Sequence, residues 1–294
     1  MDEAVGNIKH KDRLFCYLFG SEENKAWTLS LYNAVNKSSY TDPSAIEITT
    51  IKDILYLGIH NDVSFVISDE MNVYEQQSTY NPNMPFRMIE YVVHLFDKHI
   101  KQTRQNKFGK KQMTLPAPRL VVFYNGKDDQ PEEVILKLSD SFPEGSHSDV
   151  EVKARMINVN YGNSKDLMGA CKPLKEYSWL VEEVRVNNAS NGKTGVGSAI
   201  DQAIRTMPDD FVIKPFLEAH RAEVKGMLME EYNEIEQREL IREEIGEEER
   251  SKGAMDERVN NIHSLMETLK LTAEQAMDAL KIPVSDQPKY MSML

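Results

Sequence analysis

The sequence has few cysteines, no long apolar run and no excess of positive charge. Its 294 residues include two cysteines, Cys16 and Cys171, which lie far apart and form no Cys-x-x-Cys motif. This usage predicts a reduced, cytoplasmic protein without a structural zinc site. No apolar stretch approaches the roughly 20 residues of a transmembrane helix, and the acidic start Met1-Asp2-Glu3 lacks the pattern of a signal peptide. We therefore expect no membrane partner.

The chain is acidic, with 47 acidic and 35 basic residues and a formal net charge of −12. This balance argues against a protein that coats nucleic acid by bulk electrostatics. The charge is unevenly spread, because acidic residues gather between Glu218 and Glu249 while another stretch carries a basic cluster with no acid inside it. The basic cluster consists of Lys98, Lys101, Arg104, Lys107, Lys110 and Lys111.

Each charged stretch has two interpretations. A solvated face is the default for the basic cluster, and contact with backbone phosphates of DNA is the alternative, favoured by an expected position beside the site described below. The acidic stretch predicts a long amphipathic helix that docks on its own domain or on a second subunit, although its apolar residues do not sustain a coiled-coil heptad. A homo-oligomer formed through the C-terminal helices is therefore one expectation.

The glycine-rich segment from Gly192 to Ser198 does not predict a nucleotide-binding loop. A P-loop requires glycine five residues before Gly192, where the chain has Asn187. The histidines likewise show no metal-ligand spacing. A flexible linker over 187–198 is the better interpretation, which separates an N-terminal domain, 1–186, from a helical C-terminal region, 199–294.

Two apolar-alternating runs around a polar turn, residues 61–78, predict a β-hairpin that carries carboxylates among buried positions. With a four-residue loop from Ser68 to Met71, Asp62 pairs with Gln77 and Ser64 with Glu75. Diagonal neighbours on adjacent strands lie roughly 7–8 Å apart, close enough for two carboxylates to bind one ion. One face then carries Asp62, Ser64, Val66, Val73, Glu75 and Gln77, and the other carries Val63, Phe65, Ile67 and Tyr74 toward the core.

The surrounding segments predict an α/β protein with a mixed sheet flanked by helices. Apolar residues at three- and four-residue intervals from Phe86 indicate a helix after the hairpin. The apolar run Pro118–Tyr124 predicts an interior strand covered on both faces. The remaining expectations are helices to Phe19, over 22–35 and from Lys165, strands over 46–57 and 150–161, and a turn-rich segment over 127–145.

The C-terminal region is expected to be helical throughout. Residues 199–205 and a long charged stretch from Phe211 to Arg250 have helical patterning, which Ser251-Lys252-Gly253 interrupts. A short helical pair follows, in which Thr272-Ala273-Glu274-Gln275 fits a capping box.

Asp62 followed by Glu75-x-Gln77, inside a hairpin–helix–strand order, resembles the metal-dependent nuclease core of restriction endonucleases. The similarity extends to the recombination-promoting nuclease family, also described as a transposase family of the PD-(D/E)XK superfamily, over roughly residues 9–221. The strings that carry it are Lys11-Asp12-Arg13-Leu14-Phe15, Asn61-Asp62-Val63-Ser64-Phe65, residues 74–85, Val121-Val122-Phe123-Tyr124-Asn125-Gly126, Leu138-Ser139-Asp140 and Ile157-Asn158-Val159-Asn160.

The resemblance implies a restriction-endonuclease-like fold and Mg²⁺-dependent hydrolysis of DNA phosphodiester bonds, with Mn²⁺ as an alternative metal and a link to recombination or mobile elements. By that match Asp62 and Glu75 ligate the metal. Gln77 stands where many relatives have lysine; its neutral amide cannot act as a general base and can only orient a water.

Two further residues have both a functional and a purely structural interpretation. Asp12 matches a family position and is an accessory metal or water contact or, more simply, a solvated helix carboxylate. Arg87 contacts a phosphate or forms a surface salt bridge. Two other functions compete with the nuclease: a non-catalytic DNA-binding or recombination-associated protein that kept the fold, and an interaction module assembled through the acidic C-terminal helices.

Overall fold

The structure is a computed structural model that describes residues 13–50, 62–190 and 195–294. The chain divides into two compact units, Met1–Tyr232 and Asn233–Leu294. The division falls inside one long helix, α8 (Arg221–Leu269). Each unit has its own hydrophobic core and is described by itself.

The first unit is built on a six-stranded mixed sheet with the strand order β1-β2-β3-β4-β6-β5. The pairs β1–β2, β2–β3 and β5–β6 are antiparallel, whereas β3–β4 and β4–β6 are parallel. The strands are β1 (Glu47–Ile48), β2 (Val63–Ile67), β3 (Glu70–Gln77), β4 (Ala117–Tyr124), β5 (Glu133–Lys137) and β6 (Lys153–Asn158).

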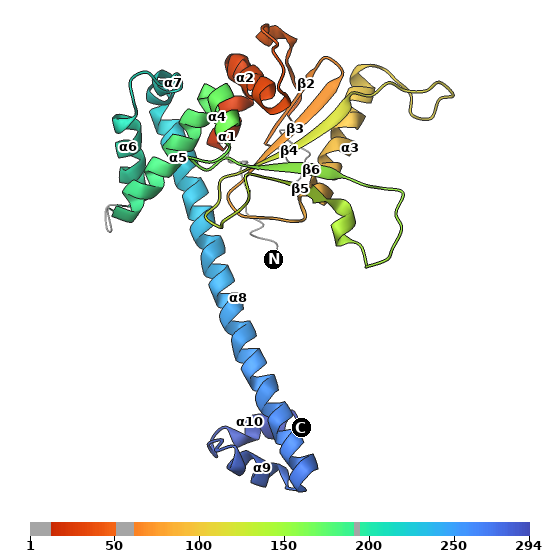
Figure 1. Ribbon diagram of the computed structural model, residues 1–294, viewed down its shortest axis with the longest axis vertical. Coiled ribbons are helices and arrows are strands. Elements are labelled where there is room, and N and C mark those ends of the chain that lie inside the picture. The colour runs from red at the N-terminus through yellow and green to blue at the C-terminus, as the bar shows by residue number, and fades with distance from the viewer. Residues whose placement is uncertain (1–12, 51–61, 191–194) are drawn as a thin grey trace, which may run out of the picture. The chain divides into compact units, whose positions relative to one another are not determined.

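Helices cover both faces of this sheet (Figure 1). Helix α3 (Met84–Gln102) connects β3 to the parallel strand β4 and packs on one face. The other face is covered mainly by helices before β1 and after β6. These are α1 (Leu14–Phe19), α2 (Lys25–Asn36), α4 (Lys165–Ala170), α5 (Lys172–Ser190), α6 (Val196–Thr206), α7 (Lys214–Ala219) and the start of α8, with short 3-10 turns η1 (Glu22–Asn24), η2 (Pro43–Ala45) and η3 (Leu138–Ser141).

The apolar pattern of each strand explains how the two cores divide. Phe65, Tyr74 and Phe123 point to the core shared with α1, α2 and α5, and the ring centroids of Tyr74 lie 5.2 and 5.3 Å from those of Phe65 and Phe123. The alternate residues Val73 and Val122 point to α3. From Val121 to Tyr124, β4 is buried on both faces and its apolar run is continuous, as the sequence predicts for an interior strand, whereas Ala117, Pro118 and Arg119 are exposed.

The expected boundary at residues 187–198 is wrong. Helix α5 continues to Ser190, and α6 begins at Val196. The buried residues Ile200 and Ile204 of α6, and Leu228 of α8, belong to the core of the first unit. A glycine-rich segment therefore joins two helices of one unit, because the hydrophobic face of α6 needs the face of α5 to cover it.

Two other expectations differ from the structure. The turn-rich segment contains an edge strand, β5, which pairs with β6. Helix α8 continues through Gly253 without an interruption. The C-terminal pair becomes α9 (Ala273–Ala279) and α10 (Gln287–Met291), and the capping box of Thr272 and Gln275 is present. The predicted strand over 46–57 is described only at its start, since 51–61 lie outside the described residues.

Among the described helices, none combines the length and the apolar character that crossing a membrane requires.

Gly253→Ala tests the continuity of α8. A Cβ added at Gly253 would meet no heavy atom within 4 Å, so alanine fits without a clash. Since glycine costs a helix interior about 0.5–1 kcal/mol relative to alanine, we expect amide hydrogen exchange near residue 253 to slow by about two- to fivefold. Faster exchange in the variant would mean that the chain needs a break at this position.

Candidate metal site

The β2–β3 hairpin places Asp62 opposite Glu75. The ladder of paired residues ends with Val63 opposite Tyr74, and one further step brings Asp62 beside Glu75. The predicted register, with Asp62 opposite Gln77, is therefore wrong by two residues, because Ser68 and Asp69 alone form the turn. Side chains alternate along a strand, so a shift of two preserves the faces. Asp62 and Glu75 share one face as expected, and Val63, Phe65, Ile67 and Tyr74 point to the core on the other.

Backbone hydrogen bonds tie the two carboxylates together. The amide of Asp62 donates to Glu75 Oε1 at 3.1 Å, and the amide of Gln76 donates to Asp62 Oδ2 at 2.7 Å. Each acid thus accepts a bond from the strand that carries the other acid. These bonds fix the orientation of both side chains at the open end of the hairpin.

Glu75 is almost completely buried, with 2% of its surface exposed. It lies on β3, an interior strand, between Asp62 and Val122 of β4. Burial raises the pKa of the Glu75 carboxyl well above its ordinary value, and the negative charge of Asp62 raises the pKa further. Arg87 opposes this rise. A buried acid beside a second acid is an arrangement that a bound cation would stabilise.

Arg87 is the nearest basic side chain described on the α3 side of the pair. It lies in the first turn of α3, with Nη2 3.8 Å from Glu75 Oε2, and donates from Nη2 to Tyr91 Oη at 2.8 Å. Burial lowers the pKa of Arg87, but Tyr91 and Glu75 outweigh this effect and raise it. The Arg87 side chain is about two-fifths exposed. It therefore faces both the buried acid and solvent.

A buried polar network holds the end of β3, and the sequence assigned it no role. Arg13 Nη1 donates to the carbonyl of Gln76 at 2.9 Å and to its side-chain oxygen at 3.3 Å. Gln76 Nε2 donates to Asn125 Oδ1 at 2.6 Å, and Asn125 Nδ2 donates to Tyr177 Oη at 3.3 Å. Arg185 also donates to the carbonyl of Asn125.

The network reaches the carboxylate pair through charge as well as through the backbone. Burial opposes protonation of Arg13, but Asp62 and Glu231 outweigh that effect and raise its pKa. In the sequence, the feature that could have indicated this network is Asn125-Gly126, which directly follows the buried strand β4. A Cβ on Gly126 would lie 2.5 Å from the carbonyl oxygen of Ser78, so glycine allows β3 and β4 to end side by side.

Gln77 closes β3 two positions after Glu75 and on the same face of the sheet. It is half-buried, and its carbonyl accepts a hydrogen bond of 3.0 Å from the amide of Asn125. Its position is compatible with a side chain that orients a water near Glu75. Asp12, the accessory candidate, lies outside the described residues.

The basic cluster extends away from the carboxylate pair along α3 and the loop that follows it. Helix α3 runs back from the end of β3 to the start of the parallel strand β4, and it carries Arg87 at its first turn. From Arg87 to Lys98 the helix rises about 16 Å at 1.5 Å per residue. Lys98 still reaches Thr49, which bonds to Ser64 two residues from Asp62, whereas the members of the cluster after Lys98 lie farther along, toward the start of β4.

Two members of the cluster have partners within the protein. Lys98 donates to the carbonyl of Thr49 at 3.0 Å, and Lys107 forms a 2.9 Å ion pair with Asp97. The other four are exposed, and no carboxylate of the described residues lies within ion-pair distance of them. These four are Lys101, Arg104, Lys110 and Lys111.

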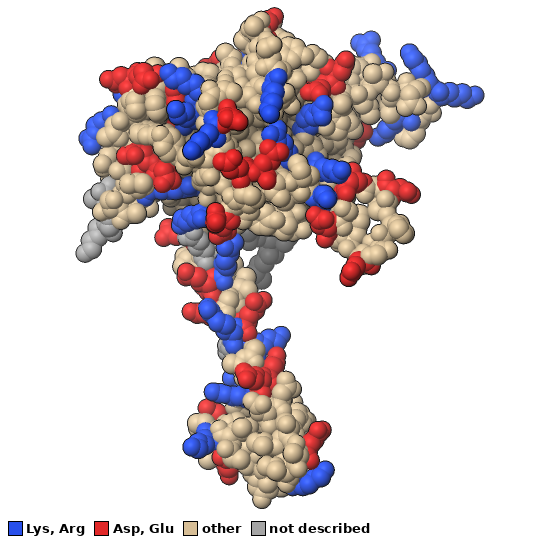
Figure 2. Space-filling view, in the orientation of Figure 1, with Lys and Arg blue, Asp and Glu red and all other residues tan. Residues whose placement is uncertain are grey.

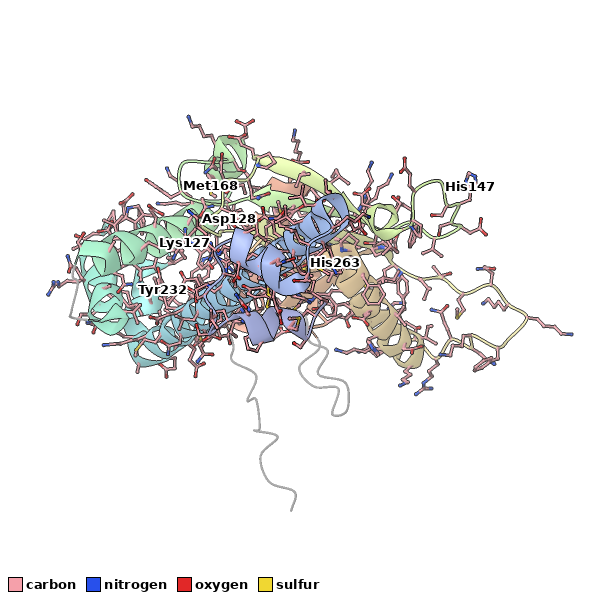
Figure 3. The ribbon with its side chains drawn as sticks, turned by 90° about the horizontal axis from the view of Figure 1, so that it is seen from below. Lys127, Asp128, His147, Met168, Tyr232 and His263 are labelled. Carbon is pink, nitrogen blue, oxygen red and sulfur yellow. The ribbon has the colours of Figure 1, made fainter. Side chains whose placement is uncertain are left out.

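The donor set fits Mg²⁺ better than a fully protein-ligated metal. Within residues 13–50, 62–190 and 195–294 there is no group of three or more histidine, cysteine, aspartate or glutamate side chains that could hold an ion. His147, for example, lies on a loop that leaves the sheet (Figure 3). Mg²⁺ commonly takes one or two carboxylates and obtains its other ligands from water and substrate phosphate. Asp62 and Glu75 meet that requirement.

A hollow of about 630 Å³ lies at the other end of β3. Its lining includes Tyr32, Glu70, Arg119 and Arg155. Arg119 bonds to Glu70 at 2.7 Å, and Tyr32 donates to the same carboxylate at 3.0 Å. The Glu70 carboxylate in this hollow is thus already bonded to Arg119 and Tyr32. The open end of the hairpin, with Asp62 and Glu75, is therefore the better candidate for a metal site.

Comparison of the chain with protein-family models, curated proteins and solved structures finds no match. The resemblance to recombination-promoting nucleases therefore stays a prediction that depends on the quoted strings and on the Asp62–Glu75 geometry.

Glu75→Gln tests the electrostatic state of the site without a substrate. Because the folded-state pKa of Glu75 is raised, folding favours the protonated acid, and stability falls as the pH rises from the ordinary glutamate pKa to the folded-state value. Each pKa unit corresponds to about 1.4 kcal/mol, which shifts the Tm of a domain of roughly 150–250 residues by about 3–6 °C. We expect the metal-free variant to melt above the unsubstituted protein at neutral pH and to lose this advantage below about pH 4.

Glu47→Gln, which changes an exposed acid on β1, serves as the control and should leave Tm unchanged at both pH values. If Glu75→Gln and the unsubstituted protein have the same Tm across this pH range, the ionised carboxylate of Glu75 does not destabilise the folded protein.

Proposed function

We propose that this protein is a metal-dependent DNA endonuclease that hydrolyses phosphodiester bonds, with Asp62 and Glu75 as ligands of Mg²⁺ or Mn²⁺. The observation that carries the proposal is the buried carboxylate of Glu75 held directly opposite Asp62. Two acids in this arrangement raise the free energy of the metal-free protein when both are ionised. A buried acid with a perturbed pKa, such as Glu75, is a candidate functional group, and a divalent cation is the partner that fits the chemistry of the two carboxylates.

The order of elements supports a restriction-endonuclease-like core. Helix α2, the three strands β1, β2 and β3, helix α3 and strand β4 follow one another, with β4 parallel to β3. Both proposed ligands come from the hairpin in the middle of this order. The order agrees with the hairpin–helix–strand pattern from which the family resemblance was drawn.

The residues around the pair have distinct proposed tasks. A bound divalent ion would polarise the phosphate and supply an activated water. Arg87, half-open to solvent beside Glu75, stabilises negative charge that develops on the phosphate. Gln77 orients the attacking water through its amide but does not remove a proton. Arg13 and Asn125 hold the end of β3 and thereby position Glu75.

Asp62→Asn tests this function. The variant keeps the size of the side chain but removes one negative charge, so it should bind the metal more weakly and lose supercoiled-plasmid nicking in Mg²⁺ by at least about 100-fold. Isothermal titration with Mn²⁺ in the absence of DNA measures metal binding separately. We expect the heat of binding to be lost as well.

Asp69→Asn is the matched control, since Asp69 is an exposed acid in the turn of the same hairpin. It should nick and bind Mn²⁺ like the unsubstituted protein. Nicking that persists in Asp62→Asn would assign the activity to another site or to a contaminant. If the unsubstituted protein binds Mn²⁺ but nicks no DNA substrate, the non-catalytic DNA-binding alternative is favoured.

A second candidate function, assembly through the C-terminal helices, has its own observation. Leu240, Ile241 and Ile245 of α8 are each 50–55% exposed. The acidic stretch that contains them would repel a second copy of itself at low ionic strength, so we propose an association that salt strengthens by screening. Such a homo-oligomer is compatible with nuclease activity in the first unit.

Ile241→Glu tests this association. The side chain is 54% exposed, so the substitution leaves folding intact while it adds charge to the apolar surface. Sedimentation velocity at about 0.1 and 1 M salt should show dimers of the unsubstituted protein that increase with salt and dimers of the variant that are strongly reduced. Val150→Glu is a control on the first unit, where Val150 is 55% exposed. A monomer at both salt concentrations would contradict the association.

A further inference from the structure

The segment between α3 and β4 presents an unusual aromatic side chain. Phe108 is 88% exposed, the largest exposed fraction among the large hydrophobic residues described. It lies inside the basic cluster, and residues 98–127 contain no aspartate or glutamate. Figure 1 shows this yellow segment leaving the body of the sheet, and Figure 2 shows basic side chains over it.

Hydrogen bonds close this segment into a defined loop. Gln105 Nε2 donates to the carbonyl of Thr114 at 2.9 Å, and the amide of Thr114 donates to Gln105 Oε1 at 2.8 Å. This reciprocal pair clamps the base of the loop. The residues between Gln105 and Thr114 therefore form a loop whose two ends are hydrogen-bonded to each other.

The tip of the loop is also fixed. The amide of Phe108 donates to Asn106 Oδ1 at 3.0 Å, and the amide of Gly109 donates to the carbonyl of Asn106 at 3.0 Å. A Cβ on Gly109 would lie 3.2 Å from that carbonyl oxygen, so the tight turn favours glycine. The turn holds Phe108 outward before any ligand binds, which lowers the entropy cost of a contact made by its ring.

The charges beside the ring favour a nucleic acid as the partner. Exposed Arg104, Lys110 and Lys111 have no described carboxylate within ion-pair distance and can bind backbone phosphates. An aromatic side chain among such cations can stack on a base, as in proteins that bind single strands. A membrane surface fits less well, because a single exposed ring buries little apolar area.

We propose that the loop from Gln105 to Thr114 is a nucleic-acid contact in which Phe108 stacks on an unpaired base while Arg104, Lys110 and Lys111 bind the flanking phosphates. The inference rests on the proposed DNA substrate, but not on hydrolysis. The sixteen residues of α3 from Arg87 to Gln102 rise about 24 Å, so the contact lies some seven nucleotides from the carboxylate pair at about 3.4 Å per nucleotide.

Binding measured without a metal tests the proposal. The probe is a fluorescein-labelled single-stranded DNA of about 20 nucleotides that carries 2-aminopurine, titrated with the full chain in EDTA so that no hydrolysis occurs. Phe108→Ala should weaken binding by about tenfold and abolish the quenching of 2-aminopurine, with an unchanged salt dependence. Phe108→Leu should resemble Phe108→Ala, because leucine keeps the apolar surface but cannot stack.

Two further variants separate stacking from charge. The double variant Lys110→Ala/Lys111→Ala should reduce the slope of log K against log salt by about 1.4 for a single strand, and it should keep part of the quenching. Val212→Ala removes an apolar side chain that is 43% exposed elsewhere in the same unit, and it should bind like the unsubstituted protein.

The outcomes are distinct. Binding of Phe108→Ala or Phe108→Leu within twofold of the unsubstituted protein would overturn the stacking contact, as would binding to anionic phosphatidylserine vesicles in preference to the oligonucleotide. Absence of any oligonucleotide binding would overturn it too. Phe108-dependent binding without plasmid nicking in Mg²⁺ would support the contact and count against the proposed hydrolysis alone.

Discussion

The apposition of Asp62 and Glu75 is the constraint on which the rest of the candidate site depends. Glu75 lies on an interior strand, so its carboxylate is removed from water while Asp62 stands beside it. Such a pair persists only when other interactions fix its geometry. The crossed backbone bonds of the hairpin, and Arg87 on the α3 side, provide them. Through Gln76 and Asn125 the same strand end is joined to β4 and α5.

The faces of the hairpin were predictable, whereas its exact pairing was not. Alternation of apolar and polar residues determines which side chains share a face, and a register error of two leaves that assignment unchanged. The turn sequence Ser68-Asp69 lacks the Asn-Gly or Asp-Gly signal of a two-residue loop, yet Ser68 adopts φ of 52° and closes one. Direct apposition of Asp62 and Glu75 therefore required the structure, although their shared face did not.

Errors elsewhere came from local signals that tertiary packing overrides. Glycine and asparagine near residue 190 indicated a domain boundary, but Ile200 and Ile204 of α6 bury their side chains against the same core as α5. Gly253 indicated a helix break, although one exposed glycine costs a long helix only about 1 kcal/mol. The direction in which the basic cluster extends could have been deduced, since a helix that joins two parallel strands must return along the sheet.

The distribution of charge gives the first unit two different ends. At one end of α3 the buried carboxylate of Glu75 stands beside Asp62, an arrangement that a cation would stabilise, and at the other a loop without acids exposes several cations and one aromatic ring. A polyanion is repelled by most of a chain of net charge −12, so in the proposed nuclease the local positive field of the loop would determine where DNA first makes contact. In the same proposal the carboxylate pair would repel phosphate until a divalent ion neutralised it. In the proposed nuclease, DNA capture at the loop and metal binding at the hairpin are therefore separate requirements, which explains why a protein of this composition would place them at opposite ends of one helix.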